Sequence, residues 1–417
     1  MADQGRTAER ARGTDGRRRA AGAVLAALLC ATACSAPAAD VPDTTARDIR
    51  ATLDRRAEAV LHHDADGYAA VVAPDATDLR TAQRKELGHL ADMPIGSWTY
   101  RLTDVTPHGA DRATADVRLG YRIKGYDSAP VSVDRVLDLE RADGRWYITA
   151  DRPAEGGGRQ LWQQGDVEVV RGTHSLVLGV GRSRDELTRI AATADRAVPA
   201  VSDAWPEKWA GRVVVLVPDT VKDMAELLGS PAANYRGIAA VTTGETGGSG
   251  TAPADRVIVN PQAYALLGDF GQRVVLTHET THVATRTRTS AATPTWLSEG
   301  FADWAAYRAE QRTAAEIAPE LADAVGGGDL PAVLPTDEDF GFDGDADRLA
   351  RAYEGGWLAC ELIAGHWGEE KLFAFYRAVG GHSGRDGAVE QALHEVLGTT
   401  PQDFTARWRE YLTDRLG

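Results

Sequence analysis

The arrangement of His278, Glu279 and His282 constrains the fold of this 417-residue chain more than any other feature of its sequence. Residues four apart on an α-helix lie about 40° apart on one face. The two imidazoles can therefore point at a single cation if residues 274–287 (VVLTHETTHVATRT) are helical. Glu279 then projects about 100° from His278, where its carboxylate reaches a water molecule on that cation. The sequence thus predicts a helix with one face turned toward a metal site.

A second segment supplies a third candidate ligand. Residues 294–302 (PTWLSEGFA) place Glu299 at the head of a further predicted helix, with sixteen residues between it and His282. Two histidines, one glutamate and an open position for water are typical of a catalytic zinc site, whereas a structural zinc site is closed, usually by thiolates. Of the three cysteines, only Cys360 lies in this half of the chain. The pattern therefore predicts a catalytic Zn²⁺ ion held by His278, His282 and Glu299.

These segments resemble the gluzincin metallopeptidases, in which a second helix contributes the glutamate, and most closely the aminopeptidase-N-like and bacterial Peptidase MA-like families. Residues 352–357 (AYEGGW) resemble the aminopeptidase-N phrase Tyr-Glu-Lys-Gly, whose tyrosine contacts the tetrahedral intermediate. The resemblance implies that Tyr353 is the oxyanion donor. Gly355 stands where that family often has lysine, and the chain lacks the Gly-x-Met-Glu-Asn signature that holds a substrate's free amine. This absence argues against a true aminopeptidase.

The predicted chemistry is metal-assisted hydrolysis. Zinc lowers the pKa of its bound water to about 7 and polarises the scissile carbonyl. Glu279 is predicted to take the proton of that water and to pass it to the leaving amine, while Tyr353 stabilises the oxyanion. Asp303 lies four residues after Glu299 on the same helix face. We expect Asp303 either to accept the outer N–H of His278 or to be a solvated acid.

The first half of the chain has a different pattern. Residues 46–72 have helical spacing with a break at 64–67, and residues 97–148 alternate with period two, with a turn at 142–144. Helices followed by a four-stranded meander indicate an α+β domain over residues 46–152, which resembles the nuclear-transport-factor-like cone fold. Such cones serve as enzymes, binding pockets or spacers. Three histidines could line its pocket but are expected to be exposed: His62, His63 and His89.

The second half is predicted to be a linker at residues 153–165 and a gluzincin-like catalytic domain at residues 166–417, with a small mixed sheet and a helical lobe. The expected strands are 167–180, 212–217 and 256–260, and the expected late helices are 347–367, 369–380, 386–397 and 401–416. The strand at 256–260 is predicted to be either an edge to which a peptide adds or ordinary sheet core. Other segments are expected to lack a site: the glycine run 244–250, the acidic run 337–347, and His366, His382 and His394.

The chain begins with the features of an export signal. Several arginines precede residues 20–33 (AAGAVLAALLCATA), which are uncharged but too few to cross about 30 Å of hydrocarbon as a helix. Residues 31–35 (ATACS) resemble a bacterial lipobox. We therefore predict a signal peptide at 1–33, lipidation of Cys34 and a tether at 34–45. The alternative is Ala-x-Ala cleavage with an incidental Cys34.

The net negative charge bears on which classes of molecule the protein binds. The chain has 46 basic and 61 acidic residues, a net charge of −15, so nucleic acid is not an expected partner. Taken together, the sequence predicts an exported, membrane-anchored zinc metallopeptidase that acts on a peptide or protein substrate outside the cytoplasmic membrane. One alternative is a cell-surface binding lipoprotein with a vestigial zinc site, which the intact Glu279 disfavours. Another is a zinc hydrolase acting on a non-peptide amide. The sequence assigns no oligomeric state.

Overall fold

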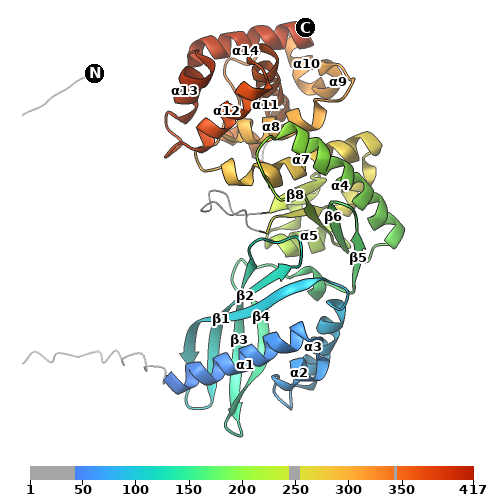
Figure 1. The fold of residues 1–417 in the computed structure, drawn as a ribbon, viewed down its shortest axis with the longest axis vertical. Helices are drawn as coiled ribbons and strands as arrows, with labels where there is room; N and C mark the ends of the chain where they lie inside the picture. Colours follow the sequence, from blue (N-terminus) through green and yellow to red (C-terminus); the bar gives the residue numbers. More distant parts are fainter. Residues whose placement is uncertain (1–42, 244–253, 342–344) are drawn as a thin grey trace, which may run out of the picture. The chain divides into compact units, whose positions relative to one another are not determined.

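Figure 1 shows the computed structural model, which describes residues 43–243, 254–341 and 345–417. The predicted signal peptide, Cys34 and nearly all of the tether lie outside the described residues. So do the glycine run and residues 342–344 of the acidic run. Among the described helices, none combines the length and the hydropathy needed to cross a membrane.

The N-terminal part consists of three helices followed by a meander of four antiparallel strands in the order β1-β2-β3-β4. These elements are α1 (Asp43–Leu61), α2 (Ala65–Ala70), α3 (Thr77–His89), β1 (Ile95–Pro107), β2 (Arg112–Ile123), β3 (Val131–Ala142) and β4 (Arg145–Pro153). Helix α1 packs on the sheet through Ile49 and Leu53. The break after α1 falls where His63 has a φ of 53°, a left-handed conformation that ends the helix. The nuclear-transport-factor-like identity of this part stays a prediction.

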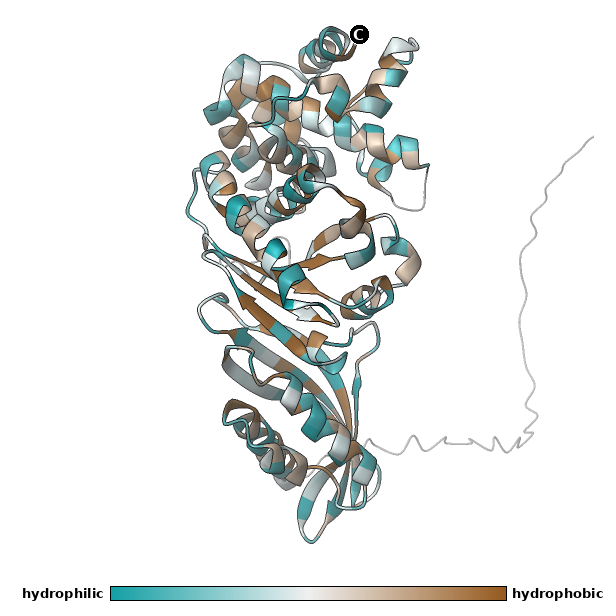
Figure 2. Ribbon diagram, turned by 90° about the vertical axis from the view of Figure 1, so that its right-hand side faces the viewer, coloured by the Kyte–Doolittle hydropathy of each residue, from teal (hydrophilic) through white to brown (hydrophobic). Residues whose placement is uncertain are grey.

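A five-stranded mixed sheet follows, with the order β5-β6-β7-β9-β8. Its strands are β5 (Val167–Arg171), β6 (Ser175–Val180), β7 (Val213–Val217), β8 (Ala240–Thr243) and β9 (Arg256–Val259). Strands β6, β7 and β9 are parallel, while β5 and β8 pair antiparallel at the two edges. The parallel strands are buried and mainly apolar (Figure 2), as strands covered on both faces are, although β6 begins with Ser175 and β9 with Arg256. Helix α4 (Arg184–Ala204) connects β6 to β7 and begins at the capping residue Ser183.

One expectation about this sheet is wrong, and the structure decides between two alternatives. The single strand expected at residues 167–180 is the hairpin of β5 and β6, which turns at residues 172–174. The strand expected at 256–260 is β9, which lies between β7 and β8, so the alternative of ordinary sheet core holds and that of an edge does not. The edge on this side is β8, whose short sequence Ala-Val-Thr-Thr precedes the glycine run and gives too weak a signal to be recognised as a strand.

Helices form the remainder of the chain. They are α5 (Val221–Leu228), α6 (Pro261–Leu266), α7 (Asp269–Thr285), α8 (Thr295–Tyr307), α9 (Ala314–Ile317), α10 (Pro319–Gly326), α11 (Ala346–Trp367), α12 (Glu369–Gly380), α13 (Ala388–Ala392) and α14 (Pro401–Leu416). The helix expected at 386–397 is α13 followed by a π-helical turn over Leu393–Leu397. From β8, helices α7, α8 and α11 follow one another outward (Figure 1), each packed on the next.

Helices α8 and α11 cross at unusually short range because both have glycine at the contact. A Cβ on Gly300 would lie 2.2 Å from the carbonyl oxygen of Gly356, and a Cβ on Gly356 would lie 2.7 Å from the carbonyl oxygen of Trp296. Only glycine permits backbones to approach so closely. Buried aromatic side chains surround this crossing, including Phe301, Trp357, Phe375 and Trp408.

The expected linker at residues 153–165 is packed against the N-terminal part. It contains a short 3-10 helix, Leu161–Gln163, in which Trp162 is buried with its ring 5.3 Å from that of Trp98. His89 is also buried, contrary to expectation, and its Nδ1 bonds to the carbonyl oxygen of Trp162 at 2.7 Å. His62 and His63 are exposed, as expected. His89 therefore has a packing role in the N-terminal part.

Candidate metal centre

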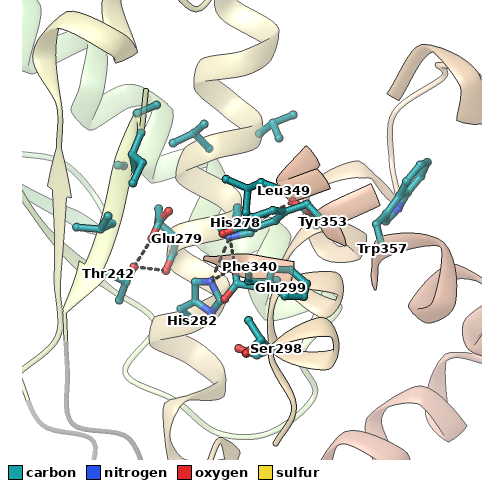
Figure 3. A pocket seen from close by; sticks show the side chains of 18 of the residues that line it. Thr242, His278, Glu279, His282, Ser298, Glu299, Phe340, Leu349, Tyr353 and Trp357 are labelled. Atoms are coloured by element: carbon teal, nitrogen blue, oxygen red, sulfur yellow. Dashed lines mark hydrogen bonds and ion pairs between the residues drawn. The ribbon is translucent and has the colours of Figure 1, made fainter. Parts of the chain in front are cut away.

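Helices α7 and α8 bring the three predicted ligands together (Figure 3). The Nε2 atoms of His278 and His282 are 3.1 Å apart, and Oε2 of Glu299 lies 3.2 Å from the first and 3.4 Å from the second. Ligand atoms about 2.1 Å from a tetrahedral zinc ion lie about 3.4 Å from one another. The donor set therefore has the chemistry and spacing that a zinc ion requires.

The packing of α8 explains why Glu299 faces the histidines. Leu297 and Phe301 are completely buried in the helical core. Glu299 is two residues from each of them, on the opposite face of the helix, and that face is turned toward α7. The side chains of all three ligands are nearly buried, with exposed fractions of 13% for His278, 16% for His282 and 17% for Glu299. The crossing with α11 at Gly300 holds the neighbouring residue, Glu299, at a fixed depth.

Asp303 lies one turn after Glu299 and contacts the far side of the His278 ring. The Nδ1 atom of His278 is 2.8 Å from Oδ1 of Asp303, so Nδ1 donates to the carboxylate and the lone pair of Nε2 points at the other ligands. Burial alone would lower the pKa of His278, but the charge and hydrogen bond of Asp303, together with Glu299, raise it well above its usual range. The site thus stabilises positive charge where a metal would bind.

The pKa of Glu299 is shifted in the opposite direction to that of His278. Burial would raise the pKa of its carboxyl group, but the charges and hydrogen bonds of His282 and His278 hold that pKa far below its usual range. Glu299 is therefore ionised at neutral pH and is ready to act as a ligand.

Glu279 is oriented by a residue that the sequence did not reveal. The hydroxyl oxygen of Thr242, on the edge strand β8, lies 2.7 Å from Oε2 of Glu279 and 3.0 Å from its backbone oxygen, and its one proton is donated to either of these acceptors (Figure 3). Glu279 is 8% exposed, and it lines the same cavity as the three ligands. No motif marks Thr242, because its role depends on β8 being the strand next to α7.

Tyr353 reaches the site from α11. Its ring centroid lies 6.4 Å from that of His278 and 5.1 Å from that of Phe340, and it lines the same cavity (Figure 3). Burial raises the pKa of the phenol, with the charges of Glu299 and Asp303 acting in the same direction. The hydroxyl is therefore protonated at neutral pH and is a hydrogen-bond donor. It bonds to no residue that the structure describes.

Glu354, the neighbour of Tyr353, has a structural task. Its carboxyl group accepts hydrogen bonds from the backbone N–H groups of Leu321 at 2.7 Å and Glu320 at 3.4 Å, which caps the start of α10. Burial, with the nearby carboxyl group of Glu320, raises the pKa of Glu354 to about 8.

These residues line a cavity of about 940 Å³. One wall is the segment from Gly237 to Thr242, which includes most of β8. The apolar part of the lining comprises Ile238, Val241, Val274, Val275, Ile317, Phe340, Leu349 and Trp357. Among the described lining residues, Arg286 alone carries an arginine or lysine side chain.

The remaining candidates lie away from this cavity. His366 and His394 are exposed and His382 is half-buried, and none of them lines it. Within the described part of the acidic run, Asp337 accepts from the backbone N–H of Thr295 and pairs with Arg385. Asp339 accepts from the backbone N–H of Thr336. Helix capping and an ion pair thus account for these two carboxylates without a calcium ion.

Comparison with known proteins gives distant likenesses only. No family model matches the sequence, and no curated protein matches it. Native yeast LTA4 hydrolase is 15% identical with a TM-score of 0.37, over 67% of this chain and 44% of that one. An M1 zinc metallopeptidase from Deinococcus radiodurans is 14% identical with a TM-score of 0.36, over 77% and 70%. A SEC-C motif containing protein from Rhodopseudomonas palustris is 19% identical with a TM-score of 0.19, over 23% and 71%. These TM-scores are too low to assign the chain to a family.

Proposed function

We propose that this chain is a zinc-dependent peptidase. One observation carries the proposal: two imidazole nitrogens and a carboxylate oxygen converge within zinc-ligand distances, and a fourth group, Glu279, lies beside them in the same cavity. A structural metal site has no use for that additional carboxylate. His278, His282 and Glu299 would hold the ion. When bound, zinc supplies a Lewis acid and a water molecule with a pKa of about 7.

The chain's own residues perform the proton transfers. Glu279 accepts the proton of the attacking water and delivers it to the leaving amine. The hydroxyl of Thr242 holds one oxygen of Glu279 in place and leaves the other oxygen for the proton. The Tyr353 hydroxyl, protonated and without a partner among the described residues, donates to the oxyanion that develops on the scissile carbonyl.

An edge strand is available to bind the peptide. Strand β8 pairs with β9 on one side, and its residues Ala240, Val241 and Thr242 line the cavity. An extended peptide can add to such an edge through main-chain hydrogen bonds. We therefore assign to β8 the role that the sequence offered to residues 256–260. Residues 240–243 include no carboxylate, which agrees with the absence of the amine-binding signature.

We further propose that the enzyme acts outside the cytoplasmic membrane. The support is the sequence of residues 1–35, with a basic start, a short apolar stretch and small residues before Cys34. Lipidation of Cys34 would anchor the enzyme to the membrane. Mass spectrometry of the protein made in a bacterium that lipidates exported proteins tests this, and an unmodified Cys34 would restrict the proposal to export.

The activity is tested with the chain from residue 35, which omits the predicted leader. Bound zinc is measured, and a peptide library is assayed with the wild type, with Glu279→Gln and with Glu390→Gln as a control at an exposed position. We expect zinc in all three and cleavage in the wild type and the control alone. Zinc without cleavage in the wild type would favour a binding lipoprotein or a hydrolase of other amides. Cleavage by Glu279→Gln would refute the mechanism.

A further inference from the structure

Arg286 is a charged residue of the cavity that the proposed mechanism does not use. It lies one helical turn after the ligand His282 and is 9% exposed, yet it lines the cavity. Its Nε atom donates to Oδ1 of Asp255 at 3.0 Å. The side chain of Asp255 is itself only 2% exposed. A buried acid thus fixes the plane of the Arg286 guanidinium group.

This pairing leaves most of the guanidinium unused. An arginine side chain has five N–H donors, and the contact with Asp255 involves the single donor on Nε. Neither Nη1 nor Nη2 has a hydrogen-bond partner in residues 43–243, 254–341 or 345–417. The two Nη atoms are not among the fully buried polar atoms without a partner, so they are open to the cavity. A bound ligand would supply the missing acceptors.

The charges around the cavity select the chemistry of that ligand. Glu279, Glu299 and Asp303 make the metal end acidic, and Arg286 is the one arginine or lysine in the described lining. Apart from the proposed metal ion, Arg286 is therefore the position in the described lining that favours an anionic group of a ligand. The planar fork of a guanidinium matches the two oxygens of a carboxylate in a bidentate arrangement. Peptides provide such a carboxylate at the C-terminus and on aspartate and glutamate side chains.

We propose that Arg286 binds a carboxylate of the peptide substrate, an inference that deepens the proposed peptidase function and depends on it. Arg286 is the fourth residue after His282 along the helix, which corresponds to a rise of about 6 Å. An extended peptide advances about 3.3 Å per residue. The recognised carboxylate therefore lies about two residues from the scissile bond, on a C-terminus or on an acidic side chain.

The experiment uses the full chain and two peptide series built on one cleaved sequence. In the first series a glutamate replaces glutamine at successive positions on both sides of the scissile bond, and in the second the C-terminus is either a free acid or an amide at successive lengths. The readout is the ratio of kcat/KM for each carboxylate peptide to that for its uncharged twin. We compare the wild type with Arg286→Gln, Arg286→Lys and Arg288→Gln. The last is a matched control, because Arg288 is about half exposed and pairs with Glu207.

We expect one position in one series to give a wild-type ratio of about 10 to 100, the range for a hydrogen bond to a charged group. The ratio falls to about 1 in Arg286→Gln, takes an intermediate value in Arg286→Lys, and is unchanged in Arg288→Gln. The series that responds identifies the source of the carboxylate. A wild-type ratio near 1 throughout would overturn the proposal, as would a ratio that survives in Arg286→Gln.

Two further measurements separate the ways in which the test can fail. If Arg286→Gln does not fold, the wild-type ratios and the inhibition of the wild type by N-acetylated tripeptides decide. Each tripeptide carries one carboxylate, at its C-terminus or on a glutamate side chain, and is compared with its uncharged twin. Equal inhibition within both pairs would overturn the proposal. If the wild type cleaves no peptide, the peptidase function fails by itself. Calorimetric binding of the same pairs to the zinc-loaded wild type and to Arg286→Gln then tests Arg286 independently. A preference for the carboxylate that Arg286→Gln loses supports the site, and no preference, or one that Arg286→Gln keeps, refutes it.

Discussion

Replacing Asp303 by asparagine should weaken zinc binding without unfolding the protein. The carboxylate accepts from Nδ1 of His278 at 2.8 Å, and the two side chains are 14% and 13% exposed, so solvent screens their interaction little. Asparagine has nearly the same size but no charge, and it does not fix the tautomer in which Nε2 of His278 faces the metal. Loss of such a partner costs about 10- to 100-fold in metal affinity, or about 1.4 to 2.7 kcal/mol.

The pH dependence of that loss follows from the same contact. Asp303 raises the pKa of His278. Protons therefore compete with zinc for His278 in the wild type as the pH falls. In Asp303→Asn the pKa of His278 is lower and this competition is weaker. We expect the difference in zinc affinity to be largest above neutral pH and to narrow as the pH is lowered.

The assay is competition with a zinc chelator between pH 5.5 and 8.5, with Asp414→Asn on α14 as a control at an exposed position. Wild type and control should bind zinc equally. The reasoning is refuted if Asp303→Asn binds zinc within twofold of the wild type above neutral pH, or if its deficit grows as the pH falls. A loss of activity with unchanged zinc affinity would place Asp303 in the chemistry of the reaction and not in the support of His278.

Three further substitutions test other parts of the site. Thr242→Val removes the hydrogen bond to Glu279 and should lower kcat about 10-fold, with the zinc content unchanged. Steady-state kinetics and metal analysis test this, and an unchanged kcat would contradict the role of Thr242. Gly300→Ala places a Cβ against the backbone of Gly356 and should lower the free energy of unfolding by about 1–3 kcal/mol, measured with denaturant. A stability equal to that of the wild type would refute the close crossing. Glu354 has a pKa of about 8, above its unfolded value, so its contribution to stability is full below about pH 4.5 and is lost as the pH rises through 8. Glu354→Gln should therefore gain about 4 kcal/mol relative to the wild type between pH 5 and 9. Chemical unfolding measures this gain, and a difference that stays constant with pH would exclude the titration.

The residues of the site that follow a local spacing could be predicted from the sequence, whereas those placed by long-range contacts could not. The spacing of His278 and His282 follows from the helix period alone, and Glu299 is recognisable because it stands near the start of the next helix. Thr242 could not be recognised, because its contact depends on the order of the strands, and strand order is set by long-range packing. Arg286 has a local clue, since it continues the ligand face by one turn, but its partner Asp255 lies on another segment.

Two outcomes in the fold have the same origin. The sequence left both edge and core open for the strand that forms β9, because a short apolar run looks the same at an edge and inside a sheet. His89 was expected to be exposed, yet the segment around Trp162 folds over it. In both cases the residues that decide the outcome are distant in sequence. Local patterns predicted the elements, and contacts between elements determined which of their faces are buried.

The crossing of α8 and α11 explains how so few residues can define the site. Glu299 immediately precedes Gly300, and Tyr353 lies three residues, close to one helical turn, before Gly356. The contact between these glycines therefore fixes the depth of the third ligand and of the oxyanion donor together. Helix α7 packs on α8 and supplies the two histidines at the spacing of one helical turn. The packing of three helices thus brings the donor atoms together.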